Sequence, residues 1–182
     1  MQEIRLHGRG GQGAVVAAEM LATAFVKGGK YASSFPMFGF ERRGAPVMSF
    51  VRVDDARIRE RTQIYSPDCV IVLDPLLKNS PAVFVGLKKG GTVILNADRL
   101  SEREKYAGLE AVGIVDATKI ALEEIAIPVT NTVILGAFAA VTGWLTLDSV
   151  LLAIKEYFSE KLLEKNIRCA QRGFAEAKVY AS

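Results

Sequence analysis

The sequence has few of the residues that build metal centres and disulfide frameworks. It contains two cysteines, Cys69 and Cys169, far apart in the chain, and a single histidine, His7. Two isolated cysteines exclude a disulfide framework, and they lack the close spacing that an iron–sulfur cluster or a structural zinc site needs. One histidine excludes a site with several imidazole ligands within this chain. We therefore expect buried thiols in a reducing compartment.

The chain also lacks an excess of charge of one sign. Its 23 lysines and arginines face 20 aspartates and glutamates, which gives a net charge of +3, and the basic residues are scattered apart from Arg42-Arg43 and Lys88-Lys89. This balance gives no support to nucleic-acid binding. No signal-peptide pattern follows Met1, so we expect a cytoplasmic protein.

One uncharged stretch, residues 125–147, raises the question of a membrane span. It contains Pro128 and several threonines, and Asn131 is typical of a helix N-cap. A helix that starts there would have only ~13 residues, or ~20 Å, against a hydrocarbon core of ~30 Å. We therefore predict a buried helix and no contact with a membrane.

The chain has the length and composition of one folded domain. Of its 182 residues, 50% are hydrophobic and 24% are charged, which excludes intrinsic disorder. No repeat, low-complexity tract or linker divides the sequence. We predict a single domain over residues 1–182.

The chain begins with a strand, a glycine-rich turn and a helix. Residues 4–7 alternate in polarity, the segment Gly8 to Gly13 follows, and residues 14–25 contain strong helix formers without a breaker. After two further glycines, residues 30–35 are short and extended enough for a second strand. The opening therefore has the order of a βαβ unit.

Later strands fall into two kinds. Residues 47–53 alternate, and because no helix precedes them we expect this strand at an edge or in antiparallel pairing. The continuous apolar runs 69–73, 92–96 and 111–115 are typical of strands covered on both faces. We expect a helix between residues 75 and 87.

From Asn131 onward the pattern predicts helices. One helix is capped near Thr146, and residues 160–178 are amphipathic, with Leu162 and Phe174 among the residues on the inner face. The predicted fold class is α/β: a mixed, largely parallel sheet covered by helices, with a glycine-rich strand-turn-helix start and a helical C-terminal third.

The glycine-rich turn is the first candidate binding site. Gly8, Gly10 and Gly13 have the spacing G-x-G-x-x-G between a strand and a helix, where free backbone N–H groups and the helix dipole favour a phosphate. The alternative is that the glycines only permit a tight turn and close packing. A nicotinamide site would need an acidic residue at the end of the second strand to bind a ribose hydroxyl, and this strand has none. Arg9 is a candidate partner for the 2′-phosphate of NADP, but the pattern as a whole does not favour a nicotinamide site. His7 either touches a ligand at this turn or packs in the core.

Two further groups are candidates for anion binding. The long loop of residues 36–46 carries Arg42-Arg43, and a guanidinium group binds phosphate or carboxylate bidentately. The alternative is a solvated pair or a salt bridge to Glu41. Asn131 either caps its helix or donates its amide to a ligand.

Several catalytic signatures are missing. The sequence has no thiamine-type G-D-G motif, no Walker A lysine after the glycines, no cysteine-rich cluster and no G-x-S-x-G elbow. By itself the chain therefore lacks a reaction centre.

Three segments together resemble the gamma subunit of the 2-oxoacid:ferredoxin oxidoreductases, most of all that of the pyruvate enzyme. They are Gly8 to Ala14, the loop from Phe35 to Pro46 with its Glu41-Arg42-Arg43-Gly44 followed by the strand to Arg52, and Asn131 to Ala137. The resemblance spans nearly the whole chain in order. The combination of three motifs is more specific than the glycine pattern alone.

The resemblance implies an oxidative decarboxylation of a 2-oxoacid that forms an acyl-CoA and CO2 and reduces ferredoxin. It implies alpha, beta and delta partner subunits, which hold thiamine diphosphate, Mg²⁺ and [4Fe–4S] clusters, and this explains the missing reaction centre. We therefore expect an oxidoreductase subunit that is inactive by itself and contributes no catalytic residue and no metal ligand.

The resemblance also associates the gamma module with coenzyme A as a substrate. On this basis Gly11, Gln12 and Gly13 would bind the pyrophosphate at the helix N-terminus. Either Arg42 or Arg43 would bind a phosphate, and Asn131 is the remaining candidate contact.

Two alternatives stay open: a free-standing, nucleotide-binding Rossmann-like oxidoreductase, and an assembly subunit without a ligand. The 2-oxoacid is not identified, because the acid is expected to meet thiamine in other subunits. The aromatic residues Phe35, Phe38 and Phe40 predict that the loop of residues 36–46 is covered by another chain, the alternative being that they pack into this domain's own core.

Overall fold

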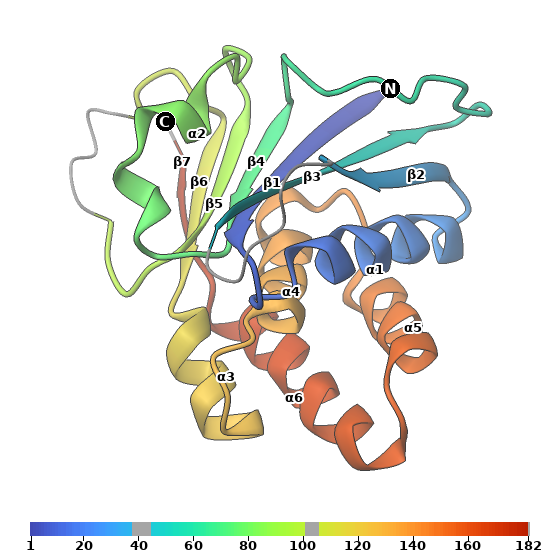
Figure 1. Cartoon of the computed structure of the whole chain (residues 1–182), viewed down its shortest axis with the longest axis vertical. Helices are drawn as coiled ribbons and strands as arrows, with labels where there is room; N and C mark the ends of the chain where they lie inside the picture. The colour runs from blue at the N-terminus through green and yellow to red at the C-terminus, as the bar shows by residue number, and fades with distance from the viewer. Residues whose placement is uncertain (38–44, 101–105, 182) are drawn as a thin grey trace.

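The computed structural model describes residues 1–37, 45–100 and 106–181, which form a seven-stranded sheet with a layer of helices (Figure 1). In chain order the elements are β1 (Gln2–Arg9), α1 (Ala14–Lys27), β2 (Tyr31–Pro36), β3 (Pro46–Asp54), β4 (Cys69–Val72), the 3₁₀ turn η1 (Leu77–Asn79), α2 (Pro81–Phe84), β5 (Thr92–Asn96), β6 (Ala111–Val115), α3 (Ala117–Ile125), α4 (Asn131–Thr142), α5 (Leu147–Tyr157), α6 (Glu160–Glu176) and β7 (Lys178–Ala181).

The sheet has the order β2-β3-β1-β4-β5-β6-β7. Strands β1, β4, β5 and β6 are parallel to one another, whereas β3 is antiparallel to both β1 and β2, and β7 is antiparallel to β6. The predicted α/β fold with a mixed, largely parallel sheet is confirmed. Strand β3 is antiparallel, as predicted, but it lies inside the sheet because β2 pairs with its outer side.

Strand β3 separates the two strands of the βαβ order at the start of the chain. In a dinucleotide-binding fold the strand after the first helix lies parallel and next to the first strand. Here β3 fills that place in the antiparallel direction, and β2 lies one strand further out. The opening is therefore not a dinucleotide-binding βαβ unit, which agrees with the missing acidic residue.

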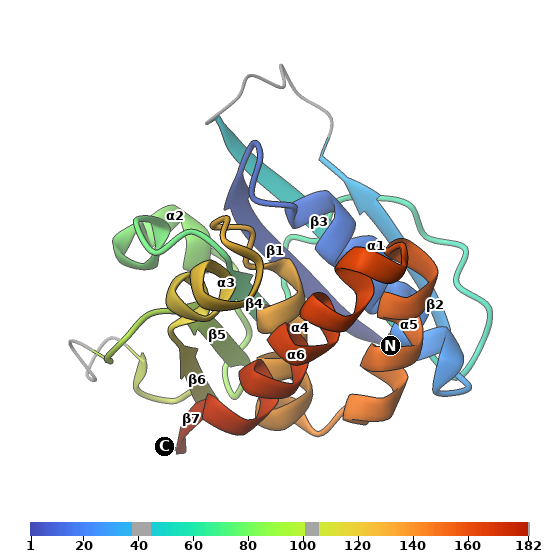
Figure 2. The same ribbon diagram turned by 90° about the horizontal axis from the view of Figure 1, so that it is seen from below.

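Five helices cover one face of the sheet (Figure 2). Helix α1 buries its alanines and Phe25 against β1 and β3, and α4 is buried along residues 131–139 between the sheet and α6. Strands β4 and β5 read as continuous apolar runs because both of their faces are covered: Ile71 packs on the helical side, and Val70 and Val72 pack on the other.

The second face of the sheet has no comparable helical layer. The helix predicted between residues 75 and 87 is wrong: the segment contains only the turn η1 and the one-turn helix α2. The break falls at Ser80, which is extended because the following Pro81 disfavours helical backbone in the residue before it. Pro81 then starts the new helix at its first position.

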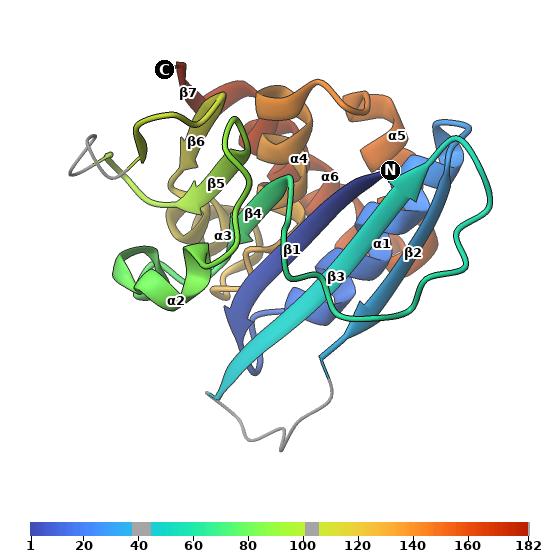
Figure 3. The ribbon, with the colours of Figure 1, turned by 90° about the horizontal axis from the view of Figure 1, so that it is seen from above.

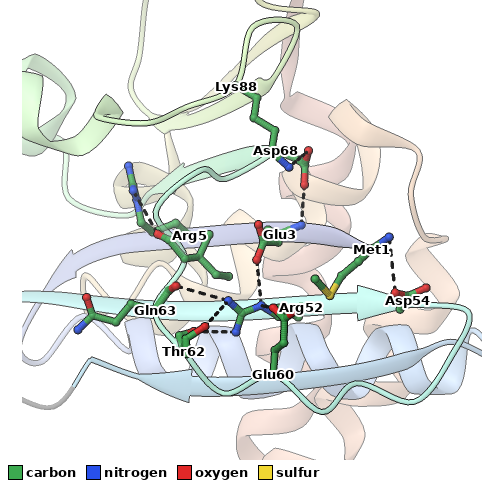
Figure 4. Close-up of polar contacts among 11 residues, drawn as sticks. Met1, Glu3, Arg5, Arg52, Asp54, Glu60, Thr62, Gln63, Asp68 and Lys88 are labelled. Atoms are coloured by element: carbon green, nitrogen blue, oxygen red, sulfur yellow. Dashed lines mark hydrogen bonds and ion pairs between the residues drawn. The ribbon is translucent and has the colours of Figure 1, made fainter.

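Residues 55–68, here called the strap, cover β1 and β3 on this second face. Figure 3 shows the strap passing beyond the edge strand β2 and returning across β3 toward β4. Two buried arginines hold it. Arg52 donates from Nη1 to the Thr62 carbonyl oxygen at 2.7 Å (Figure 4). Arg5 donates to the Ile64 carbonyl oxygen at 3.5 Å and, outside the strap, to the carbonyl oxygens of Val83 and Val85 at 2.9 and 2.7 Å. Side-chain donors therefore hold residues 62–64 of the strap, and backbone hydrogen bonds from the Asp68 N–H to the Glu3 oxygen and from the Lys88 N–H to the Pro67 oxygen hold its end.

The C-terminal third is helical as predicted, except that α6 ends at Glu176 and the edge strand β7 follows. The predicted inner face of α6 is wrong in part, because Leu162 and Phe174 are 49% and 39% exposed. The buried positions of α6 are instead mostly small or polar residues: Asn166, Cys169, Ala170 and Gly173. In the described part of the chain no helix is both long and apolar enough to cross a membrane.

Candidate functional site

The glycine loop, residues 8–13, lies at the carboxyl end of β1 and leads directly into α1. Gly11 and Gly13 have positive φ values of 96° and 77°, which other residues adopt only with strain. The Gln12 side chain folds back, and its Oε1 accepts a hydrogen bond from the Arg9 N–H at 2.8 Å. Gln12 therefore holds the loop in shape with its carbonyl group.

The loop leaves a row of backbone donors unused. The first helical hydrogen bond runs from the Ala17 N–H to the Gly13 oxygen, and Gly13 offers no side chain as a cap. Among the described residues, the N–H groups of Gly11, Gly13 and residues 14–16 have no acceptor. Free N–H groups at the positive end of a helix dipole form a binding site for an anion such as a phosphate.

Asn131 joins this loop from a distant part of the sequence. A Cβ built on Gly13 would lie 2.7 Å from Asn131 Nδ2, so the amide packs directly on the glycine. Thr130, not Asn131, is the N-cap residue of α4, and Asn131 Oδ1 accepts from the Thr132 N–H at 2.8 Å. The start of α4 therefore meets the start of α1, with the Asn131 amide between them.

Other polar side chains at the carboxyl edge of the sheet support the loop. Arg9, at the end of β1, pairs through Nε with the buried Asp74, which follows β4. The pair uses Nε of Arg9 and fixes its side chain beside the loop. Asn96, at the end of β5, donates to the Leu73 carbonyl oxygen and accepts from the Ala117 N–H. Its side chain therefore links the residue after β4 to the start of α3. The sequence analysis did not single out Asp74 or Asn96, although Asp74 follows the buried strand β4 and Asn96 ends the buried strand β5.

Arg42 and Arg43 lie outside the described residues, as do Phe38 and Phe40. The described chain resumes at Ala45, whose carbonyl oxygen accepts from the Gly10 N–H at 3.0 Å. Phe35 packs on Phe50 within this domain, with ring centroids 5.1 Å apart. For Phe35 the structure therefore shows the alternative in which the ring contacts its own domain.

His7 is buried and lies on the face of β1 opposite to α1. Arg5 Nε donates to His7 Nε2 at 2.9 Å, so Nε2 carries no proton and Nδ1 does. Burial, together with the charge of Arg5, lowers the pKa of His7 to about 4. His7 is therefore a neutral core residue at pH 7, and only a small part of it is exposed.

We expect this histidine to make the fold sensitive to acid. The unfolded chain would bind a proton near pH 6.5 and the folded chain only near pH 4, so stability falls as the pH drops through this window, by about 3 kcal/mol. Urea unfolding of the wild type and of His7→Gln between pH 4 and pH 7 measures it. Because His7 is the only histidine, the difference between the two slopes reports it alone, and equal slopes would contradict the buried neutral state.

The loop consists of glycines, Arg9 and Gln12, and the two cysteines of the chain are buried elsewhere. Burial raises the pKa of both cysteine thiols, Cys69 and Cys169, and so suppresses their thiolates. In the described ranges no cluster of three or more histidine, cysteine or acidic residues is arranged to hold a metal ion. The geometry of the loop suits binding of an anion.

Comparison with known proteins identifies the family. Residues 3–176 match the family model described as pyruvate ferredoxin/flavodoxin oxidoreductase. The chain belongs to this family. Among its relatives, the pyruvate/ketoisovalerate oxidoreductases common subunit gamma of Thermococcus kodakarensis is 54% identical over 99% of both chains. The gamma subunit of the NADH-dependent phenylglyoxylate dehydrogenase of Aromatoleum evansii is 49% identical over 99% of this chain and 96% of that one.

The fold agrees with a solved relative. The crystal structure of the pyruvate oxidoreductase subunit PORC from Thermotoga maritima matches with a TM-score of 0.83 and 36% identity over 98% of this chain and 97% of that one. The resemblance drawn from three sequence motifs is confirmed. In this oxidoreductase family the chain is a gamma-type subunit of a multi-subunit enzyme, and other subunits are its partners.

Proposed function

We propose that this chain is the gamma subunit of a 2-oxoacid:ferredoxin oxidoreductase of the pyruvate synthase type. The enzyme would oxidise pyruvate in the presence of coenzyme A to acetyl-CoA and CO2 and pass the electrons to ferredoxin. The observation that supports this most is the full-length similarity, at about half of all positions, to gamma subunits of such enzymes. Residues 1–182 would act as one gamma-type domain in the cytoplasm, within a complex that also contains alpha, beta and delta subunits.

The relatives suggest that the gamma subunit does not select the 2-oxoacid. One relative is named as common to a pyruvate and a ketoisovalerate oxidoreductase, and another belongs to a phenylglyoxylate dehydrogenase. One specificity pocket would not fit 2-oxoacids whose side chains are a methyl group, a branched chain and an aromatic ring. We therefore infer that the acid, thiamine diphosphate, Mg²⁺ and the [4Fe–4S] clusters are bound by partner subunits.

We propose that the substrate these enzymes have in common is coenzyme A, and that the glycine loop binds its pyrophosphate. The free N–H groups of Gly11, Gly13 and the first turn of α1 supply donors, and the Asn131 amide lies beside them. Gln12 keeps the loop in shape through its Oε1. We propose that Arg42 or Arg43 adds a charged contact to a phosphate.

The test is steady-state kinetics of the reconstituted complex carrying Gly11→Val, with coenzyme A and pyruvate varied separately. A Cβ at Gly11 meets no atom of the described residues within 4 Å. The substitution should therefore act by straining the backbone, whose φ is +96°, and by blocking the approach of the ligand. Losing one or two charge-assisted hydrogen bonds, each of roughly 1.5–3 kcal/mol, should raise the KM for coenzyme A ten-fold or more. The KM for pyruvate should stay unchanged.

Gly90→Val is the matched control. Gly90 also has a positive φ, of 74°, and no neighbour within 4 Å, but it precedes β5 at the opposite end of the sheet. Both variants carry a comparable backbone strain of about 1–2 kcal/mol. If Gly11→Val and Gly90→Val both kept the wild-type KM for coenzyme A, the loop would not bind it, and the assembly subunit without a ligand would be the better description.

A further inference from the structure

The strap carries a row of three exposed arginines. They are Arg57, Arg59 and Arg61. The residues between them face the sheet: Ile58 is half-buried, and Glu60 Oε2 lies 3.7 Å from the Nε atom of the buried Arg52 (Figure 4). All three arginine side chains are exposed, and Arg61 at the end of the row also lines a cavity beside β2.

These three charges are unpaired. Within the ranges that the structure describes, none of the three arginines has an ion pair or a side-chain hydrogen bond, whereas Arg5, Arg9, Arg52, Arg168 and Arg172 all have them. Glu60, the one carboxylate within the row, is directed to Arg52. A concentration of like charge on a chain of nearly balanced composition is typical of a surface that meets a partner of opposite charge.

The row is held in place before any partner arrives. Arg52 is 2% exposed and pairs with Glu3 at 2.9 Å. It also donates to the Thr62 carbonyl oxygen of the strap, and Ile64, two residues further along the strap, is fully buried. Flexible arginine-rich segments lose entropy when they bind. Anchoring the strap backbone at its middle reduces that loss.

A cavity of about 610 Å³ lies beside the row, between the strap and the edge strand β2. It is lined by Arg61 and Gln63 of the strap and by Ser33, Ser34, Phe35, Pro36 and Met37 of β2 and its end. In the described sheet β2 pairs only with β3, so the backbone groups on its other side are open for a further strand. An open edge next to an apolar cavity suits an extended peptide segment.

We propose that the arginine row and the edge cavity together form the docking surface for an acidic segment of another subunit of the complex. Carboxylates of that segment pair with Arg57, Arg59 and Arg61, and one apolar side chain enters the cavity beside Phe35. The inference uses the family's multi-subunit organisation and is independent of the coenzyme A proposal. A nucleic acid is a poorer occupant, because it would leave the apolar wall of the cavity and the open edge of β2 unused.

Charge reversal in the assembled enzyme tests the proposal. In a co-expressed complex, R57E/R59E/R61E should weaken the affinity of the gamma subunit for the remaining subunits roughly ten-fold or more, because three attractive contacts become repulsive. The control K89E/K119E/K155E changes the net charge equally at three exposed lysines on other surfaces and should keep the wild-type affinity. Unchanged affinity of the arginine variant overturns the proposal.

Cross-linking identifies the partner without disturbing the charge. The variant R57K/R59K/R61K keeps three cations but offers primary amines, and a zero-length carbodiimide joins amines to carboxylates that touch them. Mass spectrometry of the treated complex should find links from these positions to aspartates or glutamates of another subunit. Links confined to copies of this chain, or protection of the three lysines by added nucleic acid alone, overturn the proposal. Because both experiments read association, they remain decisive whatever the effect of Gly11→Val on coenzyme A.

Discussion

Gly136→Ala is expected to destabilise the fold by roughly 3 kcal/mol or more. A Cβ built on Gly136 lies 1.9 Å from the Ala170 carbonyl oxygen of α6, and one built on Gly173 lies 2.0 Å from the Val133 carbonyl oxygen of α4. The two helices thus touch through their backbones. Alanine by itself favours a helix over glycine by about 1 kcal/mol, but it would force α4 and α6 apart along a buried interface, and the second effect is larger.

The measurement is urea unfolding of the isolated chain followed by circular dichroism. Gly28→Ala is the control, because Gly28 has an ordinary φ of −79° and a Cβ there would meet nothing nearer than 3.3 Å. We expect that control to stay within about 1 kcal/mol of the wild type. A Gly136→Ala chain as stable as Gly28→Ala would contradict the backbone contact. Helix α4 also places Asn131 against the glycine loop, which we propose as the coenzyme A site.

Arg52→Met should cost about 3 kcal/mol, the low end of the range for removing one partner of a buried ion pair. The change leaves Glu3 without its cation and the Thr62 carbonyl oxygen without its donor. Glu3 is 17% exposed, so water can reach it and reduce the loss. The same change removes the hydrogen bond that holds the strap at Thr62 and should loosen the strap there.

Arg168→Met is the matched control for this substitution. Its Nε also lies 2.9 Å from a glutamate oxygen, that of Glu124, but the arginine side chain is 48% exposed. An exposed pair contributes about 1 kcal/mol or less. Unfolding free energies of the two variants give the comparison, and trypsin cleavage after Arg57, Arg59 and Arg61 reports the strap. Equal losses in both variants, or an unchanged cleavage rate in Arg52→Met, would show that Arg52 does not anchor it.

The elements that the sequence predicted best are those fixed by local pattern. The strands at residues 92–96 and 111–115 have the predicted bounds. A continuous apolar run of five residues is too short for a buried helix and indicates a strand that is covered on both faces. The strand, glycine turn and helix at the start were also predicted, since glycine at positive φ and the helix formers after it act within a few residues. Family membership followed from three motifs in order.

The predictions that were wrong concern segments whose structure depends on a proline or on a neighbouring element. A single proline, Pro81, divides the helix expected between residues 75 and 87. On α6 the pattern placed Leu162 and Phe174 inside, but the close approach to α4 requires small residues on that face. The short strand β7 was not predicted, because pairing with β6 rather than its own sequence fixes it.

The sequence by itself therefore determined where the buried strands lie along the chain, the glycine turn between the first strand and the first helix, and the family. Tertiary structure alone decided which distant residues meet: β3 beside β1, Asn131 on Gly13, and the strap on Arg5 and Arg52. In the sequence these two arginines occupy polar positions of strands that alternate in polarity. They are buried because a segment without periodicity folds back over them, and contacts between segments far apart in the chain leave no local pattern to read.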